Sequence, residues 1–312
     1  MTEPPARSWL PVAAVGTTLV LWASAFVAIR YLADDFSPGA LSLGRLAVGA
    51  TCLGAIALGR GLPRPTRHDL FTLVVIGVLW FAVYNIALNA GEQRVDAGTA
   101  IMLIQVSPVL IAVLAAVFLG DRFTGQLAVG LALSMCGIFL IASSTSQGGD
   151  RDVVGVLLCV VSAAAYAVSL VLQKPLMVRL QAVHVTWIAC SVGAVACLPF
   201  AGELVHELEA APAMSIGWMA YLGVFPTAIA FTTYAYALKH MTASRLGVTT
   251  YLAPPITIVL GYLLLDEVPP LLAYAGGLLA LVGVAVARRQ PRAAAPPSRD
   301  RGSLEGAAPR ER

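Results

Sequence analysis

Apolar runs long enough to cross a membrane recur along almost the whole chain and leave little choice of solvent. Hydrophobic residues make up 58% of the 312 residues and charged residues only 12%, and the mean hydropathy is +0.81. Soluble domains carry about 25% charged residues, so this chain has too few charges to coat a water-soluble globule. A helix needs about 20 mostly apolar residues to cross a bilayer. The composition therefore predicts an all-α integral membrane protein.

The apolar runs predict ten transmembrane helices. In chain order, the expected spans are 9–30, 38–59, 69–91, 97–119, 125–144, 153–172, 183–202, 215–237, 244–265 and 270–287. Around and within them we expect a cytoplasmic N-terminus at 1–8, a first five-helix repeat at 9–145, a second five-helix repeat at 150–288 and a disordered basic cytoplasmic tail at 289–312.

Positive charges are distributed unevenly between the two sides of these spans. Sixteen of the twenty Lys and Arg residues lie in the termini and in the loops that share their side. Only Arg30, Arg94 and Arg151 lie in the loops of the other side. Loops rich in Lys and Arg stay in the cytoplasm. The pattern predicts a multi-pass protein of the cell (inner) membrane with both termini cytoplasmic.

The second half of the chain repeats the first with an offset of 146 residues. This offset brings two prolines, two acids and two pairs of glycines into register: Pro108 and Pro254, Asp121 and Glu267, Gly130 and Gly276, and Gly137 and Gly283. Each copy holds five predicted spans, and because five is odd the second copy must enter the membrane from the opposite side. This predicts an inverted repeat of five plus five helices, an architecture common in secondary transporters.

Four segments form a recognisable set: LWASAFVAIR in the first span, LGRLAVGA in the second, the stretch beginning AGTAIMLIQVSPVL, and its counterpart beginning TTYLAPPITIVLGYLLLDE. They resemble the drug/metabolite transporter superfamily, specifically its EamA-like transporters. The resemblance covers residues 10–287. It implies ten helices around a central cavity lined chiefly by spans 1, 3, 4, 6, 8 and 9. Asp121 departs from the pattern, because the family more often has Glu there.

Prolines within predicted spans mark candidate helix breaks. Proline lacks an N–H and frees the carbonyl four residues earlier, and such a carbonyl needs a polar partner in hydrocarbon. Breaks at matching positions of two repeats point to a substrate cavity, and a packing kink is the alternative. The prolines, each with the carbonyl that it frees, are Pro108 (Ile104) in span 4, Pro254 (Thr250) in span 9 and Pro226 (Leu222) in span 8.

Amide side chains in two spans are candidates for substrate binding. Asn85 and Asn89 in span 3 lie one turn apart and share a face. Two amides are costly toward lipid, so this face should point to the bundle interior. Gln105 in span 4 shares a face with Pro108, at a position equivalent to Tyr251 in span 9. Hydrogen bonding between helices is the alternative role.

Aromatic residues supply further candidates for the substrate site. Trp22 in span 1 and Tyr166 in span 6 match under an offset of 144 residues, and Tyr234 lies on the face of span 8 that matches the two asparagines. Aromatic rings with a polar group suit a cavity for small organic molecules, and packing is the alternative. Tyr84 is expected elsewhere, because it points about 100° away from Asn85.

One charge, that of Arg45, lies inside a predicted span. An arginine at mid-bilayer costs about 2.5–3.5 kcal/mol on insertion scales. We therefore expect it to reach the outer interface, or to pair with helix-end carbonyls or with an acid such as Glu92. A structural role is favoured, with gating or binding of a substrate carboxylate as the alternative. No fixed charge is then expected at the depth of the amides, so the site should prefer neutral or zwitterionic molecules.

A stripe of small residues occurs in each repeat. Gly130, Ser134 and Gly137 in span 5 recur as Gly276, Ala280 and Gly283 in span 10. Such stripes permit close helix contact. The contact could lie within one chain or between two chains, which leaves a monomer and a homodimer open.

No cofactor or metal site is expected. The five cysteines all fall in predicted spans, form no CxxC pair and have no His at ligand spacing. No GxxxxGK[ST] loop supports nucleotide hydrolysis, and no convergent nucleophile set suggests an enzyme. The expected partners are a small-molecule substrate and membrane lipid, and not nucleic acid.

These features predict a secondary transporter that works by alternating access through a central cavity. The expected cargo is a small polar metabolite, such as an amino acid or a purine-like compound, moved by an exporter or facilitator. A multidrug efflux protein is the alternative within transport, and a membrane sensor or enzyme is a weaker one. The predicted interior lacks a convincing acid, which favours a facilitator or exchanger, although Glu92 leaves proton coupling open.

The charge distribution makes a prediction about topology. Both termini and the 60–68 loop should be cytoplasmic, and the 203–214 loop should lie outside. An impermeant thiol reagent applied to intact cells should therefore miss a cysteine introduced at Ser303. Labelling of that cysteine would overturn the assignment.

Overall fold

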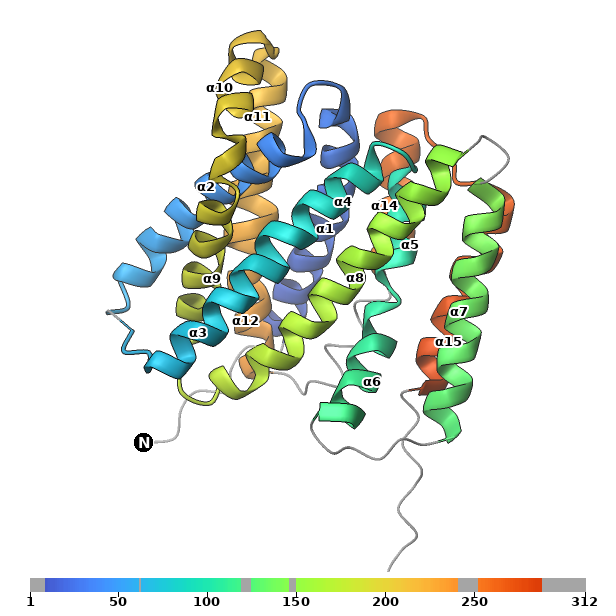
Figure 1. Ribbon diagram of the computed structural model, residues 1–312, viewed down its shortest axis with the longest axis horizontal. Coiled ribbons are helices and arrows are strands. Elements are labelled where there is room, and N and C mark those ends of the chain that lie inside the picture. The colour runs from blue at the N-terminus through green and yellow to red at the C-terminus, as the bar shows by residue number, and fades with distance from the viewer. Residues whose placement is uncertain (1–8, 62, 119–124, 146–149, 241–251, 288–312) are drawn as a thin grey trace, which may run out of the picture.

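Helices form all the regular secondary structure in residues 9–61, 63–118, 125–145, 150–240 and 252–287, the part of the chain that the computed structural model describes (Figure 1). The described part of the first half holds α1 (Leu10–Tyr31), η1 (Leu32–Asp34), α2 (Pro38–Leu58), α3 (Arg67–Ile76), η2 (Gly77–Val83), α4 (Tyr84–Glu92), α5 (Ala97–Ile104), α6 (Ser107–Phe118) and α7 (Gly125–Thr145).

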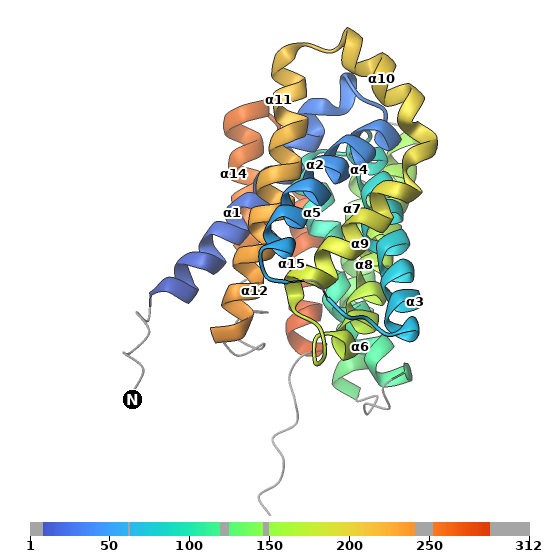
Figure 2. The same ribbon diagram turned by 90° about the vertical axis from the view of Figure 1, so that its left-hand side faces the viewer.

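The described part of the second half has a similar order of helices. It holds α8 (Asp150–Leu176), α9 (Ala182–Ala196), η4 (Leu198–Phe200), α10 (Ala201–Ala210), α11 (Ala213–Leu222), η5 (Gly223–Ile229), α12 (Ala230–His240), α14 (Ala253–Leu265) and α15 (Leu271–Ala287). Figures 1 and 2 both show α10 and α11 meeting at the top of the molecule, at the end opposite the start of α3.

Several helices are long and apolar enough to cross a membrane. Five described helices meet this criterion outright: Leu10–Asp34, Pro38–Leu58, Arg67–Glu92, Val153–Gln173 and Ala213–Tyr234. A sixth candidate is the pair Ala182–Ala196 and Leu198–Ala210, which meets at a 50° bend. Shorter apolar helices lie at Ala97–Ile111, Ala128–Ile141, Ala253–Leu265 and Leu271–Val286. The all-helical membrane class is confirmed, and each predicted span contains a helix.

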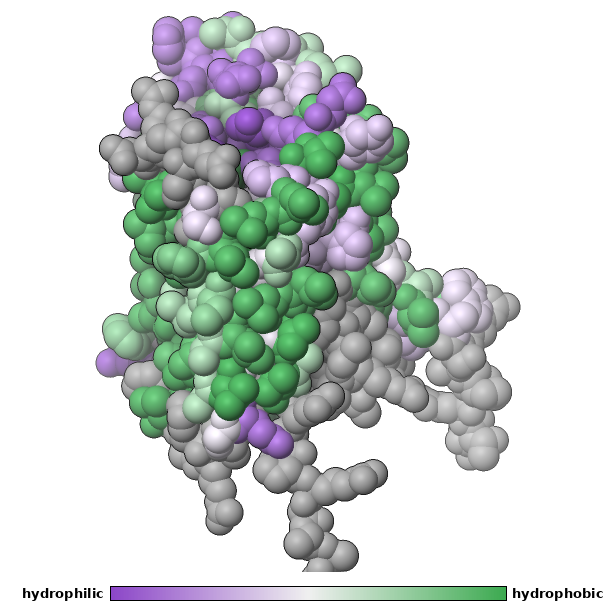
Figure 3. Space-filling view, turned by 90° about the vertical axis from the view of Figure 1, so that its right-hand side faces the viewer, coloured by the Kyte–Doolittle hydropathy of each residue, from purple (hydrophilic) through white to green (hydrophobic). Residues whose placement is uncertain are grey.

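The surface matches a lipid environment. Figure 3 shows a broad hydrophobic band over the face formed by α7 and α15, with hydrophilic residues gathered above it. Large apolar side chains such as Phe139 and Leu278 are 71% and 65% exposed there. In water, such a contiguous patch would mark a binding surface or an aggregation site. In a chain with several helices of membrane-spanning length, this surface is suited to contact with lipid tails.

Two π-helical segments occupy equivalent positions in the two halves. The segment η2 begins at Gly77 and η5 begins at Gly223, which are 146 residues apart. A Cβ on Gly77 would lie 2.7 Å from the main-chain oxygen of Ala189, and one on Gly223 would lie 2.8 Å from that of Arg45. Each glycine therefore lets its segment contact the backbone of a neighbouring helix, α9 or α2. π-Bulges of this kind frequently occur at functional sites.

Span 4 is broken, at a place slightly different from the one predicted. Helix α5 ends at Ile104, and α6 begins at Ser107 with Pro108 as its second residue. Pro254 is likewise the second residue of α14. Each proline thus stands in the first turn of a helix, where its fixed backbone angle is tolerated, instead of within an unbroken helix. The freed carbonyl of Ile104 accepts a hydrogen bond from the Ser107 hydroxyl.

The small-residue stripes of α7 and α15 pack against each other within one chain. A Cβ on Gly137 would lie 2.5 Å from the main-chain oxygen of Gly276, and one on Gly283 would lie 2.6 Å from that of Gly130. The two contacts are equivalent under the sequence repeat, because Gly137 corresponds to Gly283 and Gly276 corresponds to Gly130. The packing of α7 against α15 therefore follows the repeat. The Ser134 hydroxyl adds a hydrogen bond to the main-chain oxygen of Ala280 at 3.3 Å.

This packing makes a prediction about stability. Gly276→Leu should lower the apparent melting temperature of the purified protein, because the added side chain must separate α15 from α7, and overpacking costs about 1–3 kcal/mol. Gly217→Leu is the matched control, since a Cβ on Gly217 meets nothing within 4 Å. Equal melting temperatures for the two variants would contradict the close contact.

Candidate functional site

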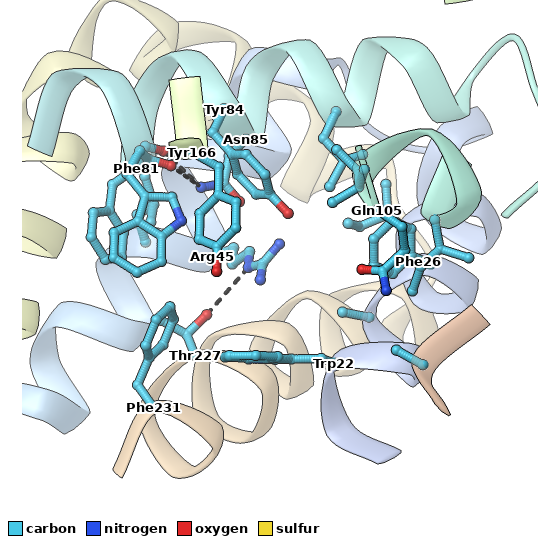
Figure 4. Close-up of a pocket in the computed structure, with 18 residues that line it drawn as sticks. Trp22, Phe26, Arg45, Phe81, Tyr84, Asn85, Gln105, Tyr166, Thr227 and Phe231 are labelled. Atoms are coloured by element: carbon cyan, nitrogen blue, oxygen red, sulfur yellow. Dashed lines mark hydrogen bonds between the residues drawn. The ribbon is translucent and has the colours of Figure 1, made fainter. Parts of the chain in front are cut away.

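A cavity of about 130 Å³ lies between helices from both halves of the chain (Figure 4). Its walls come from α1, α2, η2, α4, α5, α8, η5, α12 and α14. This volume is the space that the centre of a water molecule can reach, and one buried water needs about 10–15 Å³ of it. The cavity therefore has room for roughly ten waters. That space fits a small metabolite better than a bulky drug.

Five of the residues singled out from the sequence line this cavity. They are Trp22, Arg45, Asn85, Gln105 and Tyr166. They come from spans 1, 2, 3, 4 and 6, which are distant in sequence. Tyr84 also lines the cavity, against expectation, because the cavity is wide enough to contact two neighbouring residues of α4 that point about 100° apart.

Other predicted residues lie outside the cavity wall. Asn89 binds α2 instead: its amide nitrogen donates to the Ser42 hydroxyl at 2.9 Å and to the main-chain oxygen of Pro38 at 3.3 Å. Tyr234 packs behind Trp22, with ring centroids 5.1 Å apart. Asn89 therefore takes the interhelical role that was the alternative to substrate binding.

Two of the prolines, Pro226 and Pro254, are not among the described residues that line the cavity. Pro226 is buried within η5, and Pro254 is buried in the first turn of α14. Tyr251 and Thr250 fall within 241–251, outside the described residues. The helix breaks themselves still reach the cavity, because Gln105 lies in the break after α5 and Ala253 is the first residue of α14.

Aromatic rings form one side of the cavity. The ring of Trp80 lies 5.3 Å from that of Tyr166 and 5.3 Å from that of Phe231. Phe231 in turn meets Trp22 at 5.7 Å, and Tyr166 meets Tyr84 at 6.2 Å. Such spacings fall in the range of attractive ring pairs. The cavity therefore presents a continuous apolar wall to the aliphatic or aromatic part of a ligand.

A hydroxyl in η5 holds Arg45 at the cavity. Nε of Arg45 donates to Oγ1 of Thr227 at 3.2 Å, and Oγ1 donates onward to the main-chain oxygen of Leu222 at 2.9 Å. Leu222 is the carbonyl that Pro226 frees. One threonine thus bonds both to this carbonyl and to the guanidinium, and Figure 4 shows Thr227 facing Arg45 across the cavity wall.

The position of Arg45 overturns the expectation that no fixed charge lies at this depth. The side chain is 8% exposed, and its hydrogen bond goes to a hydroxyl rather than to an acid or the outer interface. The physical reason is that the π-helical turn of η5 and the cavity provide polar surroundings within the bundle. A buried cation with no acidic partner in hydrogen-bond contact among the described residues is suited to an anionic ligand.

Two helix starts lie near the cavity. Helix α6 begins two residues after Gln105, and α14 begins at Ala253, and both of these residues line the cavity. A helix N-terminus carries about half a positive charge, and broken helices in transporters direct such ends toward anionic substrate groups. The end of α5 at Ile104, which also lines the cavity, carries the opposite partial charge and offsets the start of α6, so Arg45 and the start of α14 make the cavity favourable for a carboxylate.

Asn85 contributes an acceptor to the same cavity. Its amide nitrogen donates to the main-chain oxygens of Phe81 at 2.8 Å and Trp80 at 3.4 Å. Oδ1 of Asn85 is buried and has no hydrogen-bond partner among the described residues. An unpaired buried acceptor is costly, so this oxygen is suited to a ligand donor such as an ammonium group.

Several cavity residues were missed by reasoning from the sequence. They are Trp80, Phe81, Thr227 and Phe231. The repeat offset could have found one of them, because Phe231 is the mate of Asn85, whereas Thr227 is the mate of Phe81. The apolar pair Trp80 and Phe81 gave no such signal, since aromatic residues in a span are ordinarily packing residues.

The sequence profile of EamA-like transporters matches residues 9–143 and 153–289. The chain belongs to the EamA-like transporter family. One match falls in each of the two predicted repeats, as the resemblance implied. The family indicates a transporter rather than an enzyme.

Curated relatives of this chain are also transporters by name. A protein of Streptantibioticus cattleyicolor named "Probable terminal-alkyne amino-acid exporter" is 36% identical over 273 residues, which cover 88% of this chain and 91% of that protein. The "Uncharacterized transporter YdfC" of Bacillus subtilis is 29% identical over 85% of this chain and 86% of its own length. A solved crystal structure, 20% identical, covers 91% of this chain and 97% of its own with a TM-score of 0.58, which shows a shared fold alone.

The double role of Thr227 can be tested through stability. Thr227→Val keeps the shape of the side chain but removes the hydroxyl that bonds to the Leu222 carbonyl and to the Arg45 guanidinium, and the loss costs about 1–3 kcal/mol for a buried group. The apparent melting temperature should fall accordingly. Thr51→Val is the matched control, because the exposed Thr51 hydroxyl bonds only to the main-chain oxygen of Ala47 in its own helix. A fall of the same size in both variants would exclude a special role for Thr227.

Proposed function

We propose that this family member is a carrier for small amino-acid-like molecules, working by alternating access through the cavity around Arg45. Its ten transmembrane helices would form an inverted repeat of five plus five, in the cell membrane, with both termini cytoplasmic. The observation that carries the substrate class is a cation, Arg45, set in an aromatic cavity, with an amide acceptor on another wall that has no partner among the described residues.

These groups match the parts of an α-amino acid. The carboxylate would bind the Arg45 guanidinium, as charge-assisted pairs are the strongest hydrogen bonds in proteins. The ammonium group would donate to Oδ1 of Asn85. The side chain would lie along the rings of Trp80 and Phe231. The relative from Streptantibioticus cattleyicolor named "Probable terminal-alkyne amino-acid exporter", similar over 88% of this chain, supports the same class and favours export as the direction.

An ion pair supports alternating access by joining the two repeats at the end assigned to the outside. Nε of Arg30, at the end of α1, lies 2.6 Å from Oε1 of Glu267, which follows α14. Nη1 of Arg30 also donates to the main-chain oxygen of Glu92 at 3.0 Å. Because α1 and α4 lie in the first repeat and Glu267 in the second, opening toward the outside would separate this pair.

The cavity volume weighs against the multidrug alternative. About 130 Å³, or roughly ten waters, suits a ligand of amino-acid size. A drug-sized ligand ordinarily occupies a pocket of about 300–1,000 Å³ in total volume, and ten waters at about 30 Å³ each reach only the lower end of that range. The aromatic wall would still accept apolar side chains of different shapes, so a range of amino acids is expected rather than a range of drugs.

Binding of a matched ligand series tests the proposal. L-propargylglycine should stabilise the purified protein in a thermal-shift measurement, since a ligand stabilises the state that it binds. The corresponding amino alcohol, which lacks the carboxylate, should bind weakly. Arg45→Gln should weaken binding of the amino acid about 10- to 100-fold, the effect of losing a charged hydrogen bond of about 1.5–3 kcal/mol.

The controls separate charge recognition from misfolding. Arg60→Gln makes the same chemical change at an exposed loop position and should bind the amino acid as the wild type does. Proteoliposome counterflow with labelled L-propargylglycine then distinguishes a carrier from a binding protein. Equal affinity for the amino acid and the amino alcohol would refute the carboxylate site.

A further inference from the structure

One face of α4 carries oxygen acceptors that lack donors on three successive turns. Asn85, Asn89 and Glu92 are spaced i, i+4 and i+7 and so share this face. Oδ1 of each asparagine and both carboxyl oxygens of Glu92 are buried without a hydrogen-bond partner among the described residues. The column begins in the cavity at Asn85 and ends at the last residue of α4.

The orientation of the two amides is fixed by their other contacts. The nitrogen of Asn85 donates to the main-chain oxygen of Phe81, and that of Asn89 to the main-chain oxygen of Pro38. A carbonyl can only accept, so the amide oxygen cannot take the place of the nitrogen in either bond. The unpaired atoms are therefore acceptor oxygens, and the column lacks hydrogen-bond donors for them among the described residues.

The charged groups around Glu92 do not supply the missing donors. Arg30 uses its guanidinium on Glu267 and on the main-chain oxygen of Glu92, and Arg45 bonds to Thr227. The titratable and charged groups that act on the Glu92 carboxyl are Arg30 from α1, Arg45 from α2, Tyr84 from α4, Cys159 from α8, Asp96 from the turn before α5, and Glu267 from the segment after α14.

A bare carboxylate in such a place is expensive. The Glu92 residue is 0% exposed, and an ionised group that is buried without hydrogen bonds costs far more than a neutral one. A proton on Glu92 removes the charge and adds an O–H donor. Residues three apart on a helix are neighbours, so this donor comes within reach of Oδ1 of Asn89. One proton thus resolves two unpaired groups.

We propose that Glu92 is a proton-binding site and that the carrier moves a proton together with its carboxylate-bearing ligand. The proton comes from the aqueous solution and converts the Glu92 carboxylate to the carboxylic acid, with no other bond made or broken. The binding of the proton rests on the column of acceptors alone. The coupling to a ligand also rests on the proposed function.

Arg45 connects the proton to the ligand. Its positive charge favours the ionised form of Glu92, and the same charge binds the ligand carboxylate in the cavity. A bound carboxylate neutralises Arg45, so it removes part of the field that favours ionised Glu92. Ligand and proton then strengthen each other's binding, and this coupling is reciprocal. A ligand made in excess inside the cell would leave down its own gradient with a proton.

The proton site is tested first without any ligand. Infrared difference spectra of the purified wild-type protein across a pH titration should contain the C=O band of one buried carboxylic acid. Glu92→Gln should lack that band. Glu209→Gln, which changes an exposed acid on α10 in the same way, should retain it. Melting temperatures check that each variant is folded. A band that survives in folded Glu92→Gln overturns the proton site.

The coupling is tested in proteoliposomes that contain L-propargylglycine at equal concentration on both sides. With the membrane potential clamped by potassium and valinomycin, a pH gradient should drive accumulation in the alkaline compartment, up to about tenfold per pH unit for one proton per ligand. Glu92→Gln should show a ratio of one, and Glu209→Gln the wild-type ratio. Accumulation on the acidic side, or none in a wild type active in counterflow, overturns the coupling.

The infrared and proteoliposome experiments also distinguish failure of the proton site from failure of the proposed function. A wild type that neither binds nor exchanges L-propargylglycine refutes the amino-acid cargo for that probe, while the infrared arm still decides whether Glu92 binds a proton. A wild type that exchanges the probe but lacks the Glu92 band refutes the proton site and leaves the carrier function standing.

Discussion

A helix in lipid must satisfy its own backbone, and the positions at which this chain breaks that pattern determine where its polar site lies. Pro226 frees the carbonyl of Leu222, and Pro108 frees that of Ile104. A neighbouring hydroxyl satisfies each of them, from Thr227 and Ser107 respectively. The first of these hydroxyls also holds Arg45. Irregular backbone at this depth is tolerated only where it is buried in protein or lines a cavity, so the breaks, the cation and the cavity form one unit.

Much of the architecture follows from sequence periodicity. The length of the apolar runs predicted ten spans, and each of them contains a helix. The offset of 146 residues relates the glycine contacts of α7 and α15 to each other. It also relates the helix starts at Pro108 and Pro254. The hydrogen bonding within single turns was harder to predict from the sequence. Nothing in the spacing of Gly77–Val83 indicates a π-turn, because its wider hydrogen bonding depends on the approach of α9 to Gly77.

The candidate site was only partly predictable, for a related reason. Trp22, Asn85, Gln105 and Tyr166 were found because polar or amphipathic residues are costly toward lipid. The same rule selected Asn89, which instead donates a hydrogen bond to Ser42 in α2. The rule cannot separate the two roles, because an amide avoids lipid whether its partner is a substrate or another helix. Arg45 was placed at the interface or against an acid because no sequence pattern shows that a threonine from another helix faces it. Tertiary contacts decide between roles that periodicity leaves equal.

The π-helical turn before α4 has a consequence for how the cavity could be altered from a distance. A π-turn contains one residue more than the α-helical turn that would replace it. If η2 rewound into regular α-helical turns with all its residues kept, everything beyond it would rotate by about 100° relative to α3. That rotation would replace Asn85 with a neighbouring side chain at the cavity wall. The recognition chemistry of this cavity is thus set by the phase of a helix as well as by the residues that face it.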